Sequence, residues 1–165
     1  SIMFSPLLIS EASQLLQIAK QRNIRIATAE SCTGGLISAL LTEIAGSSAV
    51  FDRGLLTYSN QAKQEMLGVS SVLLNQHGAV SAEVATAMAE GALVRSSAQL
   101  SVAVTGIAGP DGGSDVKPVG TVYIASAFVE RDTITQKHLF LGDRSSVRIQ
   151  TVEAAIKLLV QQLSS

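Results

Sequence analysis

The sequence is poor in the residues that most often build metal sites and disulfides. Cys32 is the one cysteine among 165 residues, which excludes an intramolecular disulfide framework. The two histidines, His77 and His138, lie far apart in the chain, so a Cys/His metal cluster is excluded as well. We therefore expect a protein that holds no metal, and the cysteine content favours a reducing compartment.

Charge and long apolar runs are also scarce. Charged residues make up 15% of the chain, the formal net charge is -1, and no basic stripe indicates nucleic-acid binding. No run reaches the roughly 18 apolar residues that a membrane span needs. Residues 1–4 lack the basic start and long apolar core of a signal peptide. We expect a cytoplasmic protein that binds neither nucleic acid nor membrane.

What the chain does contain is a regular alternation of apolar patterns, which predicts both strands and helices. Apolar residues make up 47% of the chain and aromatic residues only 4%, so the core is built from Ala, Val, Leu and Ile. The predicted strands span 24–29, 49–58, 100–105, 121–128 and 133–141, and the predicted helices span 7–22, 34–45, 59–67, 81–96 and 143–163, with a connector at 70–80.

This order predicts a single domain over residues 1–165, an α/β fold in the form of a three-layer α/β/α sandwich. Its sheet is mixed and mostly parallel, and the last two strands form a C-terminal antiparallel hairpin.

The most informative stretch is Ala-Glu-Ser-Cys-Thr-Gly-Gly at residues 29–35, where a predicted strand ends and a helix begins. Ser31 lies at this corner, and the unpaired N–H groups of a helix start can hold an anion or a developing oxyanion. Gly34 and Gly35 let a ligand approach the main chain. Two interpretations are open, because Ser31 and Thr33 are also ordinary helix caps.

Three segments follow three predicted strands and therefore meet at the carboxyl edge of the sheet. They carry Ser31, the pair Tyr58 and Lys63, and Thr105 with its glycine loop. This set suits amide hydrolysis without metal, with Ser31 as nucleophile and a desolvated Lys63 as its base. Tyr58 would relay a proton or orient the lysine. The alternatives are a solvated surface lysine and a tyrosine with a packed ring.

Cys32 is the rival nucleophile, because a thiol at a helix start has a lowered pKa. A small apolar Cys packed beneath a helix start is also common, and we favour Ser31.

The loop at 106–120 contains five glycines and two prolines and matches neither a nucleoside triphosphate nor a dinucleotide fingerprint, so no cofactor is expected. Arg144 and Arg148, at the start of the last helix, can hold a phosphate or remain solvated.

Five separated motifs together resemble the CinA C-terminal domain family, whose stand-alone members are nicotinamide mononucleotide amidohydrolases. The resemblance covers about residues 10–160, and longer CinA proteins carry an extra N-terminal domain whose pyrophosphatase activity we do not expect here. The motifs are Ala-Glu-Ser-Cys-Thr-Gly-Gly at 29–35, Gly-Ser-Ser at 46–48, Tyr-Ser-Asn at 58–60 with Lys63, Gly-Ala-Val-Ser at 78–81, and the loop segments at 105–110 and 117–120.

The resemblance implies deamidation of nicotinamide mononucleotide in pyridine nucleotide salvage, by a homodimer that contains no cofactor. The implied catalytic residues are Ser31, Lys63 and Tyr58. The residues that we predict to bind substrate are Glu30, Thr33, Gly34, Gly35, Ser48, Thr105, Gly106, Gly109, Arg144 and Arg148. A different class of function, a non-catalytic nucleotide-binding or sensing module, would use the same corner and loop without needing a desolvated base.

Overall fold

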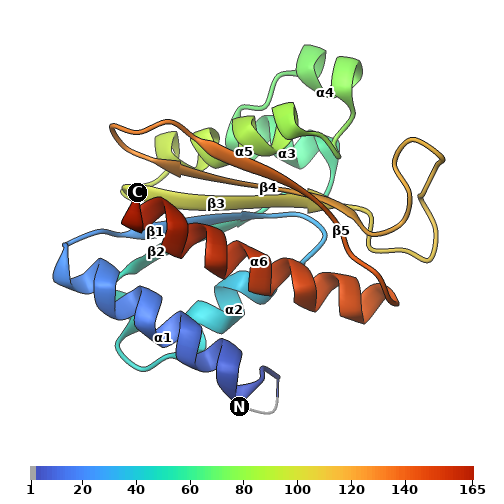
Figure 1. Ribbon diagram of the computed structural model, residues 1–165. Helices are drawn as coiled ribbons and strands as arrows, with labels where there is room; N and C mark the ends of the chain where they lie inside the picture. The colour runs from blue at the N-terminus through green and yellow to red at the C-terminus, as the bar shows by residue number, and fades with distance from the viewer. Residues whose placement is uncertain (1–2) are drawn as a thin grey trace.

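A computed structural model describes residues 3–165 of the chain as helices packed on a five-stranded sheet (Figure 1). Residues 1 and 2, which the predicted domain over residues 1–165 includes, lie outside the described part. The strands are β1 (Ile26–Glu30), β2 (Phe51–Leu56), β3 (Leu100–Gly106), β4 (Thr121–Phe128) and β5 (Ile134–Leu139). The helices are α1 (Pro6–Gln21), α2 (Leu36–Glu43), the short 3-10 helix η1 (Ser47–Ala49), α3 (Asn60–Leu67), α4 (Ser71–His77), α5 (Ala82–Val94) and α6 (Arg144–Ser164).

The sheet has the strand order β2-β1-β3-β4-β5. Strands β2, β1 and β3 run parallel, while β4 is antiparallel to β3 and β5 is antiparallel to β4. Glu30, the last residue of β1, pairs with Leu56 on one side and Val104 on the other. The carboxyl ends of the three parallel strands therefore lie at one level, and the predicted fold class is confirmed.

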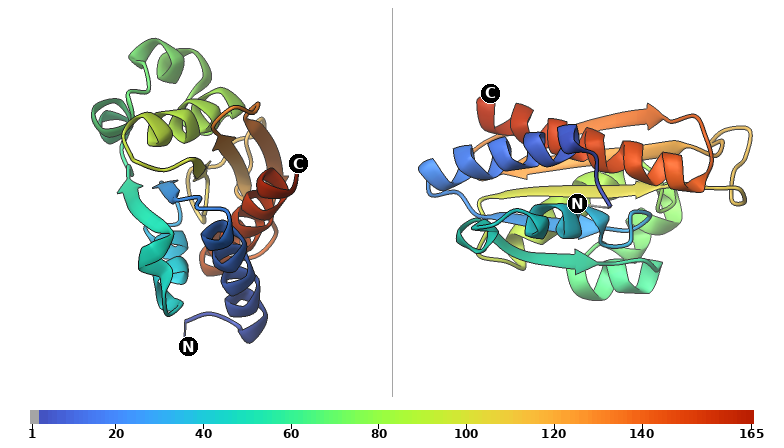
Figure 2. Two further views of the ribbon diagram at one scale, coloured as in Figure 1. Left: turned by 90° about the vertical axis from the view of Figure 1, so that its left-hand side faces the viewer. Right: turned by 90° about the horizontal axis from the view of Figure 1, so that it is seen from below.

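Helices cover both faces of the sheet, as Figure 2 shows from two directions. One face packs against α1, α2 and α6, and the other packs against α5, with α3 and α4 outside it. The two faces differ in side-chain size because successive strand residues point to opposite sides. The α6 side carries Ile26, Val102 and Ile124, whereas the α5 side carries Ala27, Ala29, Ala103, Ala125 and Ala127.

The small residues on the α5 side allow close packing of the helices there. A Cβ atom added to Gly91 of α5 would lie 2.1 Å from the carbonyl oxygen of Leu67 in α3, so only glycine fits at this contact. This approach fixes α3 against α5 and hence fixes the residues that α3 presents to the carboxyl edge of the sheet.

Most predicted helix starts are confirmed by their caps. The side chains of Ser5, Ser59, Ser81 and Asp143 each accept a hydrogen bond from a backbone N–H three residues later, which satisfies one donor of the first turn. The start of α2 differs from expectation, since Gly35 is its N-cap and makes no side-chain cap.

The predicted connector at 70–80 is wrong over most of its length, because it contains helix α4. Ser70 caps this helix by accepting a hydrogen bond from the Leu73 N–H. Only Leu74 of α4 is buried, so the segment has no apolar periodicity from which a helix can be recognised. Among the described residues 3–165, no helix is both long and apolar enough to cross a membrane.

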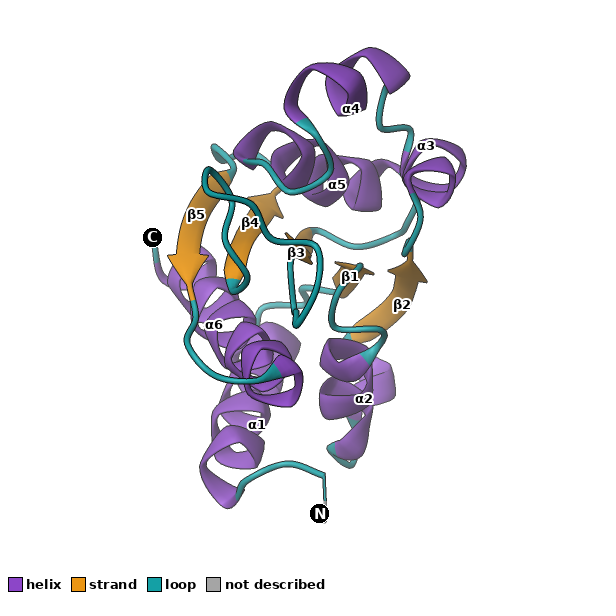
Figure 3. Cartoon of the chain, turned by 90° about the vertical axis from the view of Figure 1, so that its right-hand side faces the viewer, coloured by secondary structure: helices purple, strands orange, loops and turns teal. Residues whose placement is uncertain are grey.

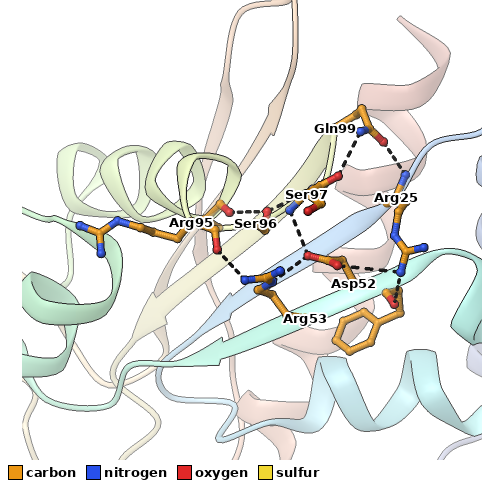
Figure 4. A network of polar contacts seen from close by, with 10 residues as sticks. Arg25, Asp52, Arg53, Arg95, Ser96, Ser97 and Gln99 are labelled. Carbon is orange, nitrogen blue, oxygen red and sulfur yellow. Dashed lines mark hydrogen bonds and ion pairs between the residues drawn. The ribbon is translucent and has the colours of Figure 1, made fainter.

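A network of polar contacts lies at the opposite edge of the sheet, at the amino ends of the parallel strands (Figure 4). The carboxylate of Asp52 in β2 accepts hydrogen bonds from Arg53 Nε at 2.8 Å and from the Ser97 N–H at 3.1 Å. Arg53 also donates to the carbonyl oxygen of Arg95, at 3.1 Å. Asp52 thereby ties β2 to the segment that leads from α5 into β3.

We predict that Asp52→Asn lowers the melting temperature by a few degrees at neutral pH. Burial raises the pKa of Asp52, but hydrogen bonds from Ser97 and Arg53 and the charges of Arg53 and Arg25 outweigh it, so the pKa lies below its ordinary 3.8. The carboxylate therefore stabilises the fold above that pH, and its contribution is lost as the pH falls through the lowered value.

Thermal unfolding of wild type and Asp52→Asn between neutral and acidic pH measures this effect. Asp115→Asn, which changes an exposed carboxylate of the glycine loop, is the control. A difference between wild type and Asp52→Asn that does not shrink in acid would contradict the account.

Candidate active site

Three loops meet at the carboxyl edge of the parallel strands, which Figure 3 views directly. They enclose a cavity of about 280 Å³. The lining comes from the turn after β1, the segment before α3 with the first turn of α3, the residues before α5, the end of β3 with the glycine loop that follows, and the first residue of α6. The lining residues are Ser31, Cys32, Tyr58, Asn60, Lys63, Ala79, Val80, Thr105, Gly106, Ile107, Ala108, Gly109, Asp111, Gly112 and Arg144.

Ser31 and Lys63 meet at the base of this cavity. The Lys63 Nζ atom lies 3.0 Å from Ser31 Oγ, 2.9 Å from the carbonyl oxygen of Thr57 and 3.1 Å from that of Tyr58. Lys63 is only 1% exposed, and no carboxylate of residues 3–165 forms an ion pair with it. It is therefore not the solvated surface lysine of the alternative interpretation.

The environment of Lys63 disfavours its charged form. Burial lowers the pKa of Lys63 from its ordinary value of 10.5, and the neighbouring Cys32 opposes this shift. Lowering the pKa of a lysine amine increases the fraction that is neutral and able to accept a proton. Lys63 occupies this position because the Ser59 cap starts α3 directly after β2 and places Lys63 one turn into the helix.

Cys32 lines the cavity but is 6% exposed. Burial raises the pKa of the Cys32 thiol to about 11, against smaller lowering contributions that include the charge of Arg148. At neutral pH the group is therefore a neutral thiol, which is a poor nucleophile compared with a thiolate. This environment does not provide the lowered thiol pKa that would favour Cys32 over Ser31.

Tyr58 contacts the serine-lysine pair through its backbone rather than through its ring. Its carbonyl oxygen accepts from Lys63 Nζ and also lies 3.4 Å from Ser31 Oγ. Its side chain is 62% exposed, and its phenol oxygen lies 3.3 Å from Arg144 Nη2. The phenol thus lies at the mouth of the cavity, beside the guanidinium of Arg144.

Glu30 belongs to the start of α2 and does not line the cavity. Its carboxylate is buried and accepts four hydrogen bonds: from Thr33 Oγ1 at 2.6 Å, Ile37 N at 2.9 Å, Ser38 N at 3.0 Å and Ser38 Oγ at 2.7 Å. A buried carboxylate at a helix N-terminus is stabilised by the unpaired N–H groups and the helix dipole. Glu30 and Thr33, both predicted to bind substrate, are occupied in holding this turn.

The structure also separates four other predicted binding residues from the cavity. Gly34 and Gly35 form the turn itself, with φ of 59° and 103°, a region that L side chains rarely adopt. Ser48 is exposed on η1, before β2 begins and hence at the opposite edge of the sheet. Arg148 donates to the carbonyl oxygens of Cys32 and Thr33.

Four predicted binding residues do line the cavity: Thr105, Gly106, Gly109 and Arg144. Thr105 Oγ1 donates to the carbonyl oxygen of Ala79 at 2.9 Å, and Arg144 Nη1 donates to that of Gly109 at 2.8 Å. The glycine loop is closed at its base, where Ile107 N donates to Thr121 O and Gly120 N donates to Ile107 O. The loop is therefore anchored on both sides of the segment that faces the cavity.

Sequence reasoning missed several lining residues, among them Asn60, Val80 and Asp111. Asn60 follows the same predicted strand as Tyr58, and this position could have indicated that it lies at the cavity. Val80 lies in the Gly-Ala-Val-Ser motif before α5. Its place at the cavity depends on the hydrogen bond from Thr105 to the carbonyl oxygen of Ala79, which the sequence does not indicate. Among residues 3–165 no group of three or more His, Cys, Asp or Glu side chains is arranged to hold a metal ion.

The fold and the cavity define an α/β protein in which a serine hydroxyl meets a buried lysine amine at the carboxyl edge of a mixed sheet. Comparison with protein families matches residues 9–163 to the CinA C-terminal domain. The chain belongs to this family.

Its relatives include the nicotinamide-nucleotide amidohydrolase PncC of Escherichia coli (strain K12), which is 50% identical over 155 residues, or 94% of each chain. The chain is also similar to a CinA-like protein of Syntrophobacter fumaroxidans, with 53% identity over 145 residues that make up 88% of this chain and 34% of that protein. The crystal structure of the competence/damage inducible protein CihA from Agrobacterium tumefaciens superposes with a TM-score of 0.95 at 45% identity, covering 98% of both chains.

The lowered pKa of Lys63 generates a prediction about stability. Between its folded and unfolded pKa values the unfolded chain binds more protons at this position, so raising the pH favours the folded state. We expect the free energy of unfolding of wild type to rise, relative to that of Lys63→Met, as the pH increases from neutral toward 10.5.

Urea unfolding at several pH values measures this difference. The control is Lys157→Met, which removes an exposed lysine of α6 and should leave the pH dependence unchanged. Parallel curves for wild type and Lys63→Met would show that the folded and unfolded pKa values of Lys63 are alike.

Proposed function

We propose that this chain hydrolyses the carboxamide of nicotinamide mononucleotide, giving nicotinate mononucleotide and ammonia. The similarity to nicotinamide-nucleotide amidohydrolases named PncC, which covers 94% of this chain for the Escherichia coli protein, supports this substrate. The observation that carries the chemistry is the 3.0 Å contact between Ser31 Oγ and the buried Lys63 Nζ. Amide hydrolysis needs an activated nucleophile, and a serine hydroxyl becomes one only beside a base.

The contacts of Lys63 suit a neutral amine. A neutral amine has two N–H donors and one lone pair. The carbonyl oxygens of Thr57 and Tyr58 can accept the two N–H groups, at 2.9 and 3.1 Å. In the ammonium form the third N–H of Lys63 donates to Ser31 Oγ. In the neutral form a lone pair replaces that N–H and can take the Ser31 proton, so Lys63 acts as the general base.

The reaction proceeds through an acyl-enzyme. Ser31 Oγ attacks the carboxamide carbon while its proton moves to Lys63 Nζ, and the carbonyl oxygen becomes an oxyanion that backbone N–H groups at the α2 start stabilise. Lys63 then returns the proton to the leaving nitrogen, and the C–N bond breaks to release ammonia. A water molecule, deprotonated by the same amine, attacks the ester and frees Ser31 and nicotinate mononucleotide.

The rest of the cavity suits a nucleotide whose phosphate lies at the mouth. Arg144 is the one cationic lining residue besides Lys63, and an arginine fork matches phosphate oxygens. Thr105, Gly106 and Gly109 also line the cavity. The phenol of Tyr58 lies beside Arg144, so Tyr58 acts on the substrate at the mouth while its carbonyl orients Lys63.

A non-catalytic nucleotide-binding module is the second candidate function. It would use the same mouth and loop, but simple binding gives no reason to bury an amine against a serine hydroxyl. We also propose that the enzyme works in cytoplasmic pyridine nucleotide salvage, as a homodimer without metal or cofactor.

We expect purified wild-type protein to release ammonia from nicotinamide mononucleotide, with EDTA present, and Ser31→Ala to release none while keeping its melting temperature. The reason is that, among residues 3–165, Ser31 is the residue whose hydroxyl makes a hydrogen bond with Lys63. Wild-type rates in Ser31→Ala would exclude Ser31 and direct attention to Cys32. Saturable binding without release by wild type would favour the binding module.

For Lys63→Met we expect kcat to fall by about 10²-fold or more, the usual loss for a general base. In wild type, kcat/KM should rise with pH as the buried amine loses its proton, because only the neutral form accepts the Ser31 proton. This rise should be absent from the residual activity of Lys63→Met and present in the Lys157→Met control. A rise of the same shape in both variants would exclude Lys63 as the titrating base.

A further inference from the structure

Arg148 makes a two-pronged contact with the turn that carries Ser31. It lies on α6, one turn after Arg144, but the two arginines reach different places. Its Nε donates to the carbonyl oxygen of Cys32 at 3.0 Å, and its Nη2 donates to that of Thr33 at 3.1 Å. A rigid guanidinium fork therefore holds two consecutive carbonyl groups directly after the nucleophile.

Holding these carbonyls also fixes the N–H groups of the turn. A trans peptide unit is planar, and its C=O and N–H point in opposite directions. The Ser31 carbonyl is held in turn by the Gly34 N–H, at 3.0 Å. The peptide units on both sides of Cys32 are thus oriented through their oxygens, and among the described residues the N–H groups of Cys32 and Thr33 donate no hydrogen bond to another residue.

The opposite side of the turn is held by a buried negative charge. Glu30 accepts from the Thr33 hydroxyl and from the N–H groups of Ile37 and Ser38, while Arg148 holds the carbonyls. Gly34 makes room for the guanidinium, because a Cβ atom there would lie 3.2 Å from Arg148 Nη2. The Glu30 carboxylate of β1 and the Arg148 guanidinium of α6 thus hold the turn at residues 31–35 from two sides.

We infer that Arg148 is a positioning residue of the reaction, acting together with Glu30 rather than on the phosphate. Through the Cys32 carbonyl it orients the Thr33 N–H. Through the Thr33 carbonyl it orients the Gly34 N–H, which holds the Ser31 carbonyl and so orients the Cys32 N–H. Both N–H groups then meet the oxyanion formed on the carbonyl attacked by Ser31. The inference rests on the proposed amide hydrolysis. Since an oxyanion exists only after attack, loss of this orientation slows turnover and leaves substrate binding unchanged.

The test compares kcat and KM of Arg148→Gln and Arg148→Lys for ammonia release from nicotinamide mononucleotide. We expect kcat of Arg148→Gln to fall by about 10- to 100-fold, the scale of a misplaced reacting group, with KM within about threefold of wild type. Arg148→Lys keeps the charge and one donor but not the fork, so it should restore part of the lost kcat.

The matched control is Arg131→Gln. Arg131 Nη1 donates to the carbonyl oxygen of Gln162 at 2.8 Å, near the other end of α6, so this variant also removes a guanidinium-to-carbonyl contact of the helix. We expect it to alter the melting temperature without altering kcat. A loss of kcat that merely follows the melting temperature in both variants would overturn the inference.

Glu30→Gln gives a second measurement that does not depend on how well the arginine variants fold. It is isosteric, removes the negative charge behind the turn and should also lower kcat at constant KM. Combined with Arg148→Gln, it should cost less than the product of the two single losses, because both act on one segment.

Three results would contradict the inference. The first is a raised KM with unchanged kcat in Arg148→Gln, which would indicate that Arg148 binds the phosphate. The others are losses in the double variant that multiply independently, and kcat and KM of Arg148→Gln that equal those of an active wild type. Absence of ammonia release by wild type would instead refute the proposed function, and this inference with it.

Discussion

The site depends on one unfavourable placement, the burial of the Lys63 amine with no carboxylate beside it. Removing a lysine ammonium from water is costly, and the group responds by losing its proton more readily. Two backbone carbonyls and the Ser31 hydroxyl surround the amine, and none of them carries a charge. The rest of the fold must hold α3 in place against this cost, which it does through the Ser59 cap and the close contact at Gly91.

The sequence was sufficient to predict the layers, the hairpin and the strand-to-helix corner, because these follow from local patterns. Period-two alternation and serine caps report on residues a few positions apart. The same alternation in β1 places Glu30 on the side of Ile26, which faces α2. The contact of Glu30 with the start of α2 could therefore be predicted from the sequence. Glu30 was assigned to substrate because a polar residue next to a nucleophile suggested binding.

The remaining features could not be predicted because they depend on residues far apart in the chain. Arg148 is 116 residues from Cys32, and no local pattern indicates that they meet. The pairing of Lys63 with Ser31, which are 32 residues apart, could be predicted because each follows a parallel strand. Nothing in the spacing of Arg144 and Arg148 indicates that one reaches the cavity mouth and the other reaches the turn. Helix α4 could not be predicted because its local pattern is too weak: Leu74 is its single buried residue.

The glycine loop is anchored independently of the elements that hold Ser31 and Lys63. Its ends are closed by hydrogen bonds between Ile107 and the pair Gly120 and Thr121, while Ser31 and Lys63 are held by other elements. The residues between those ends can therefore change in length or composition without moving Ser31 or Lys63. Evolution, or a protein engineer, can alter which ligand enters the cavity by changing this one segment and leave the contact between Ser31 and Lys63 as it is.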